Sequence, residues 1–252
     1  MLLLAGTSGF SYSEWKGNFY PAKLPAAEML RYYAARFPTV EINNTFYRMP
    51  AESMLSRWAR EVPAGFSFTL KAPQRITHHK RLREAEQEAS VFLQRAAALG
   101  DKLGPVLFQL PPVLRKDVPR LEDFLALLPG DGNRFAFEFR HASWQDDAVY
   151  AVLRARGAMT CVADTDKGDT PLVATADQGY LRLRRTQYDD GELRAWAERV
   201  AAQPWGRAYV YFKHEDEGLG PQFAQRFIEA WAEVQGGGPP RRASRATPPN
   251  AP

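Results

Sequence analysis

The chain has 252 residues, of which 45% are hydrophobic and 25% are charged, proportions typical of a folded globular protein. No apolar run approaches the ~18 residues that a membrane-spanning helix needs, which excludes a spanning protein. The single cysteine, Cys161, excludes an internal disulfide framework and a metal site built from several cysteines. The first ten residues lack the basic region and the cleavage site of a signal peptide, so we expect a cytoplasmic protein.

The positive charge is concentrated in the C-terminal segment 236–252. The chain carries a net charge of +4, and this segment holds three arginines and no acidic residue, so the remainder carries about +1. That is too little for the basic surface of a nucleic-acid-binding domain. The segment is rich in Gly, Pro, Ala and Arg and has no apolar periodicity. We therefore predict a disordered tail, which would bind nucleic acid only non-specifically.

Eight short apolar runs alternate with helix-like amphipathic stretches from residue 2 to about residue 233. This alternation, with no linker inside it, predicts a single α/β domain over residues 1–235 with the (β/α)8 architecture of a TIM barrel. A doubly wound open sheet is the alternative, but no glycine-rich fingerprint follows the first strand. Residues 165–177 have a loop-like composition, so we expect the helix after the sixth strand to be missing or replaced. The expected strands are Leu2–Gly6, Thr39–Asn44, Phe66–Lys71, Pro105–Leu110, Phe135–Arg140, Met159–Ala163, Tyr180–Leu183 and Ala208–Lys213.

Alternate residues of the expected strands differ in character. Three phenylalanines of Phe135–Arg140 share one face, whereas Glu138 and Arg140 share the other. The second, third and eighth expected strands show the same pattern, with polar residues toward the C-terminal end of one face. In a barrel one face of each strand meets the helices and the other fills the interior. The pattern therefore places charged side chains inside the barrel, where they must either form ion pairs or serve in binding or catalysis.

The C-terminal ends of the strands gather on one face of a TIM barrel, where barrel enzymes have their active sites. Four cations at the expected strand ends (Lys71, Arg140, Arg182 and Lys213) outnumber three carboxylates (Glu41, Glu138 and Asp164), which favours a small anionic ligand such as a carboxylate or a phosphate ester. A structural ion network that closes the barrel is the alternative. The candidate acids and bases are Glu138, Glu41, His78 and His141. The candidate substrate-binding residues are Ser8, Tyr12, Trp15, Asn43, Tyr47, Lys71, Gln109, Arg140, Asp164, Arg182 and Lys213.

The loop after the first expected strand is rich in aromatic residues. Tyr12 and Trp15 lie within the run GFSYSEWKGNFYP, and Phe46 and Tyr47 follow the second strand. Such side chains at the mouth of a pocket can stack on a ring of a ligand. They can equally pack on one another as a lid. Both interpretations stay open.

Three other kinds of chemistry are weaker alternatives. A glycosidase needs two opposed carboxyl groups, which Glu41 and Glu138 could supply. A divalent metal site could use these two residues with Asp164, His78 and His141, but the cations on the same face would compete for the carboxylates. Lys71 or Lys213 could form a Schiff base if desolvation or another cation lowered its pKa. We predict no metal site and no cofactor.

Six motifs follow one another along the chain: GTSGFSYSEWKGNFYP, VEINNTFYRMP, FSFTLKAPQRITH, LGPVLFQLPP, FEFRHASW and YVYFKHE. Together they resemble the YecE-like family, domain of unknown function 72, from about Gly6 to Trp231. The resemblance implies a TIM-barrel-like fold but no particular reaction. It places the family's characteristic positions at Gly6, Ser8, Gly9, Tyr12, Trp15, Gly17, Tyr20, Pro21, Glu41, Asn43, Thr45, Phe46, Tyr47, Lys71, Thr77, His78, Gln109, Pro111, Glu138, Arg140, His141 and Trp144.

Two departures from the pattern of that family add cations near the expected barrel mouth. Phe212-Lys213-His214 stands where many members have Phe-Asn-Asn, and Arg184-Arg185 stands where many have His-Gly. The ligand of other members is therefore not transferred to this chain.

Our hypothesis is an enzyme that acts by general acid–base chemistry on a small anionic, ring-containing substrate. Its class stays open among isomerase, lyase and hydrolase. A non-catalytic metabolite- or partner-binding protein and a nucleic-acid-processing protein are the alternatives. No membrane partner is expected, and the oligomeric state is open.

Overall fold

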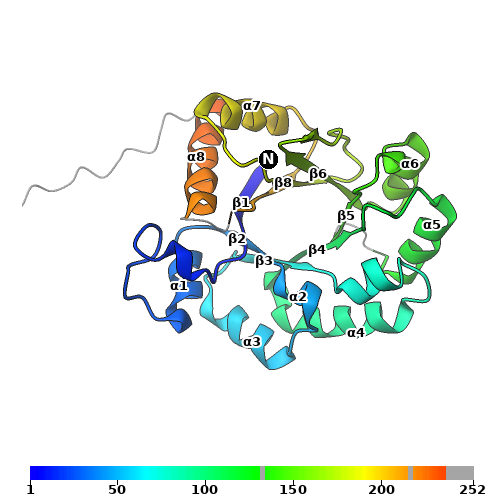
Figure 1. The fold of residues 1–252 in the computed structure, drawn as a ribbon, viewed down its shortest axis with the longest axis horizontal. Helices are drawn as coiled ribbons and strands as arrows, with labels where there is room; N and C mark the ends of the chain where they lie inside the picture. The colour runs from blue at the N-terminus through cyan, green and yellow to red at the C-terminus, as the bar shows by residue number, and fades with distance from the viewer. Residues whose placement is uncertain (131–133, 215–217, 237–252) are drawn as a thin grey trace, which may run out of the picture.

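The computed structural model describes residues 1–130, 134–214 and 218–236. Eight parallel strands form a closed ring, because the outermost strands β5 and β6 also pair with each other. Figure 1 shows this ring at the centre with helices around it. The ring confirms the predicted barrel and excludes the open doubly wound sheet. In ring order the strands are β1 (Leu2–Ser8), β2 (Thr39–Ile42), β3 (Ser67–Lys71), β4 (Leu103–Gln109), β5 (Phe135–Glu138), β6 (Met159–Thr165), β8 (Gln178–Leu183) and β9 (Arg207–Phe212).

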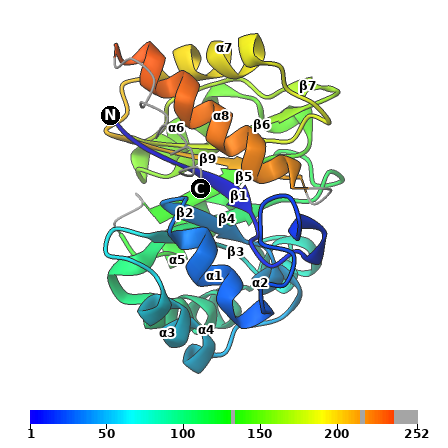
Figure 2. The ribbon, with the colours of Figure 1, turned by 90° about the vertical axis from the view of Figure 1, so that its left-hand side faces the viewer.

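The helices cover the outside of the barrel, with α7 and α8 on one side and α1, α3 and α4 on the other (Figure 2). The α-helices are α1 (Met29–Ala34), α2 (Asn44–Tyr47), α3 (Glu52–Glu61), α4 (Glu86–Ala96), α5 (Val118–Leu127), α6 (Asp147–Ala155), α7 (Asp190–Ala201) and α8 (Leu219–Val234). The short 3-10 helices are η1 (Ser13–Trp15), η2 (Ala26–Glu28), η4 (Ala97–Lys102) and η6 (Ala142–Trp144), and η3 (Arg75–His79) is a π-helix. None of the helices in the described ranges is long and apolar enough to cross a membrane.

No helix connects β6 to β8, as predicted, and residues 166–177 are all described. The two-residue strand β7 (Gly168–Asp169) instead folds back antiparallel on the end of β6. The loop that follows is tied to the start of β6 by one hydroxyl group. Thr175 accepts a hydrogen bond from the Thr160 amide at 2.9 Å and donates one to the Ala158 carbonyl at 2.7 Å. The loop thereby satisfies polar groups beside a strand that has no covering helix of its own.

Two apolar clusters follow from the alternation of each strand. The outer cluster packs strand residues such as Phe137 and Phe108 against helix residues such as Phe124, whose ring lies 5.1 Å from that of Phe108. The inner cluster fills the barrel and consists of Leu4, Leu107, Ala136, Met159, Cys161, Tyr180, Tyr209 and Tyr211. The interior is therefore a packed core up to its C-terminal end, where the inner residues become charged.

The barrel and its helices, from β1 to α8, lie within residues 1–235. The predicted disordered tail, residues 236–252, lies outside the described residues except for Gly236.

Candidate functional site

Arg182 lies at the centre of the C-terminal end of the barrel. Its side chain projects inward from β8 and is 1% exposed. Its Nε and one terminal nitrogen contact Glu41 Oε1 of β2 at 3.1 and 2.8 Å, and its other terminal nitrogen contacts Glu138 Oε2 of β5 at 2.6 Å. Both carboxylates are fully buried. One guanidinium therefore joins three strands across the barrel, and Glu41 and Glu138 are paired, as buried charges require.

Uncharged side chains complete this network. Ser8 Oγ donates to Glu41 Oε1 at 2.6 Å, and the Tyr180 hydroxyl donates to Glu41 Oε2. Gln109 Nε2 donates to Glu138 Oε2 at 2.8 Å, and Asn43 Nδ2 donates to Glu41 Oε1 at 3.3 Å. Six sequence candidates thus lie beside one another here: Ser8, Glu41, Asn43, Gln109, Glu138 and Arg182. Tyr180 was not among the candidates, although it lies two residues before Arg182 and therefore on the same face of β8.

Both carboxylates of the network are held in the ionised form. Burial raises the pKa of the Glu41 carboxyl, but Arg182 and the Ser8 hydroxyl outweigh this effect and hold the pKa below its usual value. Burial also opposes ionisation of Glu138, yet Arg182, Arg140 and Arg184 together hold its pKa well below the usual range. A general acid must carry a proton at working pH. These two groups are therefore fixed negative charges, which does not favour the glycosidase alternative.

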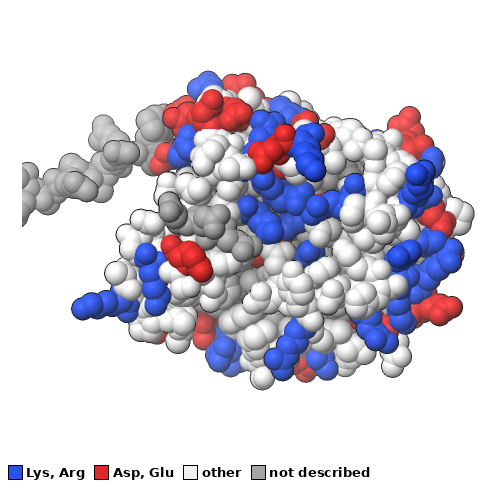
Figure 3. Space-filling view, in the orientation of Figure 1, with Lys and Arg blue, Asp and Glu red and all other residues white. Residues whose placement is uncertain are grey.

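Two further arginines lie at the rim, beside the outer oxygen of Glu138. Arg140 Nε lies 2.5 Å and a terminal nitrogen of Arg184 lies 3.4 Å from Glu138 Oε1. Within the described residues this oxygen accepts no hydrogen bond of good geometry, so both contacts are ionic. Arg140 and Arg184 also line a cavity of about 520 Å³ between β5 and the β6–β7 hairpin. Figure 3 shows lysine and arginine side chains gathered near the centre of this face.

Lys71 and His78 lie beside the network rather than within it. Lys71 projects from the end of β3, is 9% exposed, and holds its ammonium 3.9 Å from the centre of the Phe46 ring. The His78 ring meets the same phenylalanine edge-on at 4.9 Å. Tyr47 also touches Phe46 but is 74% exposed, so only part of it faces the site. Burial, and then Lys71, lower the pKa of His78, so its imidazole is neutral at pH 7.

Asp164 does not join the candidate site. It is fully buried, but it projects from the outer face of β6 toward α7. Its Oδ1 accepts from Arg185 Nε at 2.7 Å, and its Oδ2 accepts from the Tyr188 hydroxyl at 2.9 Å and from Trp196 Nε1 at 3.0 Å. The expectation that Asp164 and Arg185 face the barrel mouth is therefore corrected. They join the loop after β8 to α7.

We expect Asp164→Asn to lower stability without changing ligand binding. The substitution removes one of the two carboxylates paired with Arg185 and weakens three hydrogen bonds, of which two are buried. This corresponds to a loss of about 1–3 kcal/mol in the free energy of unfolding. Urea unfolding measures the loss, and titration with a site ligand measures binding. A folded Asp164→Asn protein with weakened ligand binding would contradict this placement.

The remaining candidates occupy the surroundings of the network. His141 accepts a hydrogen bond from the Ser143 amide at 3.1 Å and caps η6, so its Nδ1 is engaged in local structure. Trp15 is fully buried under its own loop. Tyr12 donates to the Ser8 carbonyl at 2.8 Å. Lys213 is exposed just beyond β9. Of these four, Tyr12 comes nearest to the network, through Ser8.

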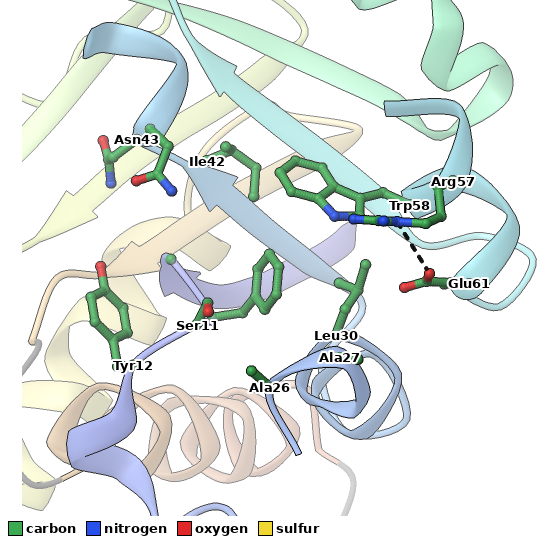
Figure 4. Close-up of a pocket in the computed structure, with 13 residues that line it drawn as sticks. Ser11, Tyr12, Ala26, Ala27, Leu30, Ile42, Asn43, Arg57, Trp58 and Glu61 are labelled. Carbon is green, nitrogen blue, oxygen red and sulfur yellow. Dashed lines mark ion pairs between the residues drawn. The ribbon is translucent and has the colours of Figure 1, made fainter. Parts of the chain in front are cut away.

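In the aromatic loop after β1, some side chains pack on one another as a lid and others line a cavity, so both predicted interpretations apply. The rings of Trp15, Phe19 and Tyr20 pack on one another at centroid distances of 4.7–6.0 Å, which makes most of the loop a packed cover. Phe10 and Tyr12 instead line a second cavity of about 510 Å³. Figure 4 shows this cavity between the loop and helix α3, with Trp58, Arg57 and Glu61 on its far wall and Asn43 on the side of the network.

The described residues contain no group of three or more His, Cys, Asp or Glu side chains that could hold a metal ion. The residues proposed for that alternative are separated: Asp164 faces α7, His141 caps η6, and Glu41 and Glu138 are bound by Arg182. The side chains at the barrel mouth are instead mainly arginine and lysine, whose N–H groups suit an anion.

A family model described as protein of unknown function DUF72 matches residues 4–247. The chain belongs to the DUF72 family. DUF72 relatives include YecE of Escherichia coli K12, which is 30% identical over 54% of this chain and 52% of YecE, so the chain spans about half the length of that relative in the match. YunF of Bacillus subtilis is 25% identical over 80% of this chain and 76% of YunF.

Solved structures of DUF72 proteins share the fold. A DUF72 family protein from Thermotoga maritima superposes with a TM-score of 0.79 at 28% identity, covering 90% of this chain and 98% of that one. A DUF72 family protein from Enterococcus faecalis gives 0.76 at 19% identity, covering 91% and 95%. The predicted family and the TIM-barrel fold are thus confirmed.

Proposed function

We propose that this chain is an enzyme that acts by general acid–base chemistry on a small anionic, ring-containing substrate at the C-terminal face of the barrel. The surplus of positive charge around the network carries the proposal. Four cations, Arg182, Arg140, Arg184 and Lys71, surround the two carboxylates Glu41 and Glu138. A carboxylate or phosphate group of a substrate would balance the excess, and the rim arginines would bind it.

The aromatic lining of the second cavity supports the proposal that the substrate contains a ring. Asn43 both contacts Glu41 in the network and lines the cavity that Phe10, Tyr12 and Trp58 share. A substrate with its anion at Arg140 and Arg184 would extend toward these aromatic side chains, which can stack on a ring. Lys213, at the end of β9, adds positive charge to the same face.

Proton transfer falls to His78 in this proposal. Glu41 and Glu138 are ionised and bound by arginines, so they orient Arg182 rather than exchange protons. The neutral imidazole of His78 can accept a proton near pH 7. His141, engaged in capping η6, is the weaker candidate.

Thermal unfolding in the presence of sugar phosphates, nucleotides and small carboxylates tests the proposal. A ligand at ~100 times its Kd should stabilise the wild type by about 2.7 kcal/mol, a shift of several degrees in Tm. Arg140→Ala should weaken binding at least tenfold. Arg194→Ala, which removes an exposed arginine paired with Glu198 on α7, should bind like the wild type. Stabilisation by none of these classes would contradict the proposal.

A further inference from the structure

Lys71 is a buried lysine without a carboxylate partner. It is 9% exposed, and no ion pair or hydrogen bond of its ammonium occurs among the described residues. The nearby carboxylates are already bound: Glu41 by Arg182 and Ser8, and Glu138 by three arginines. The ring face of Phe46 contacts the ammonium and stabilises it, and the more distant carboxylates Glu41 and Glu138 add only partial compensation. A buried cation with so little compensation is destabilised relative to the neutral amine.

The electrostatic surroundings of Lys71 also favour the neutral amine over the ammonium. Burial, and then the charge of Arg182, lower the pKa of Lys71 to about 8, although Glu41 and Glu138 partly oppose this. At pH 7 roughly a tenth of such a lysine is the neutral amine, and the neutral amine is the nucleophilic form. Lysines that form imines in enzymes are activated by desolvation or by a neighbouring cation, and Lys71 has both.

The segment after β3 has a strained backbone. The π-helix η3 carries Thr77 and His78, and π-helical turns are frequent at functional sites. Three residues within the next five, Arg81, Leu82 and Glu84, adopt positive φ angles of 52°, 69° and 47°. Non-glycine residues rarely adopt such angles, and backbone strain of this kind clusters at active sites. This segment places His78 against the same phenylalanine that Lys71 contacts.

We infer that Lys71 forms an imine with a carbonyl group of the substrate, which is therefore an anionic aldehyde or ketone such as a 2-oxo acid or a keto phosphate. The inference rests on the proposed function, because the rim arginines Arg140 and Arg184 hold the anion while Lys71 reaches the carbonyl carbon. It narrows the reaction to the classes that an imine promotes, isomerisation and lyase chemistry next to a carbonyl.

The chemistry balances without a cofactor. The neutral Lys71 amine attacks the carbonyl carbon to give a carbinolamine. The carbinolamine takes up one proton from solvent and loses one water, which leaves a protonated imine. The imine withdraws electrons from the neighbouring carbon, so a C–H or C–C bond there breaks heterolytically. His78 takes the released proton and returns it to a carbon or an oxygen of the product. Water then adds to the protonated imine, which restores the carbonyl group and the neutral Lys71 amine and returns one proton to solvent.

Reductive trapping of the full chain tests the inference. The wild type is incubated at pH 8 with sodium cyanoborohydride and either glyoxylate or pyridoxal 5′-phosphate, two anionic aldehydes, and each modified lysine is located by peptide mass spectrometry. Lys102 is the internal control, because it is 8% exposed and lies just before β4, at the other end of the barrel, 3.9 Å from a carboxylate oxygen of Asp101. We expect Lys71 to be labelled at least tenfold faster than Lys102, and inorganic phosphate to slow the labelling of Lys71.

Two variants and one neutral probe separate the outcomes. Lys71→Arg should lose the fast label and still be stabilised by anions, whereas Lys102→Arg should keep both. Anion binding with labelling of Lys71 no faster than Lys102 would overturn the imine and leave the proposed function standing. If acetaldehyde, which is neutral, labelled Lys71 as fast as the anionic aldehydes do, and phosphate did not slow that labelling, the anionic substrate class would be overturned. Because the labelled lysines are located in the wild-type protein, this comparison of Lys71 with Lys102 can be made even if a variant does not fold.

Discussion

Replacing Arg182 by methionine is expected to lower the free energy of unfolding by about 3–5 kcal/mol. Methionine fills much of the same space, so the loss comes from charge rather than from packing. Without the guanidinium, the buried carboxylates Glu41 and Glu138 face each other without the group that joins them. In a chain of this length the loss corresponds to a fall in Tm of roughly 6–20 °C. Calorimetry of the wild type and of Arg182→Met measures it.

Arg194→Ala is the matched control for this experiment. Arg194 also pairs with two carboxylates, those of Glu198 and Glu233, but its side chain is 53% exposed. Exposed pairs contribute about 0–1 kcal/mol, so Tm should change by no more than a few degrees. A similar small change in Arg182→Met would mean that the central network is dispensable for the stability of the fold.

Acid is expected to destabilise the protein through Glu41 and Glu138. The pKa values of both groups are lowered in the folded state, so their contribution to stability is complete above the unfolded value near 4.3. As the pH falls below that value, the unfolded chain takes up protons that the folded chain does not. The free energy of unfolding should therefore fall as the pH drops below about 4, by up to about 1.4 kcal/mol per pH unit from each site.

Urea unfolding at a series of pH values measures this dependence. Glu138→Gln removes one titrating site, so its slope should be shallower by about 1.4 kcal/mol per pH unit, although it is less stable than the wild type at pH 7. Arg194→Ala, which leaves the network intact, should keep the wild-type slope. A slope in Glu138→Gln equal to that of the wild type would show that other carboxyl groups govern the acid transition.

The barrel was predictable because each strand carries two independent signals. An apolar run locates the strand, and in strands such as Phe135–Arg140 the alternation also identifies the inner face. All eight predicted strands are present, and their ends differ from the prediction by at most two residues. The missing helix was predictable from composition alone, whereas the β7 hairpin that replaces it depends on pairing with β6 that no local pattern reveals.

The candidate site was predictable only where the alternation is clear. The strand Met159–Thr165 carries a single polar residue, Thr160, before Asp164, so its sequence shows no clear alternation and does not indicate that Asp164 points outward. For β8 the signal was available: Arg182 on the inner face places Tyr180 and Arg184 on that face as well. By the same rule His141 follows the inward Arg140 and points away. The isolation of Lys71 depends on which arginines bind the carboxylates, which only the three-dimensional structure reveals.

The Arg182 network also bears on the lifetime of the folded state. Arg182 and Glu41 are 141 positions apart in the chain, so their contact requires strands from both halves of the barrel to be in place. Contacts between such distant segments are entropically costly to close and form late in folding. Interactions that form after the transition state slow unfolding more than they accelerate folding. We therefore expect the buried charges at the C-terminal end of the barrel to slow unfolding of the closed ring of strands.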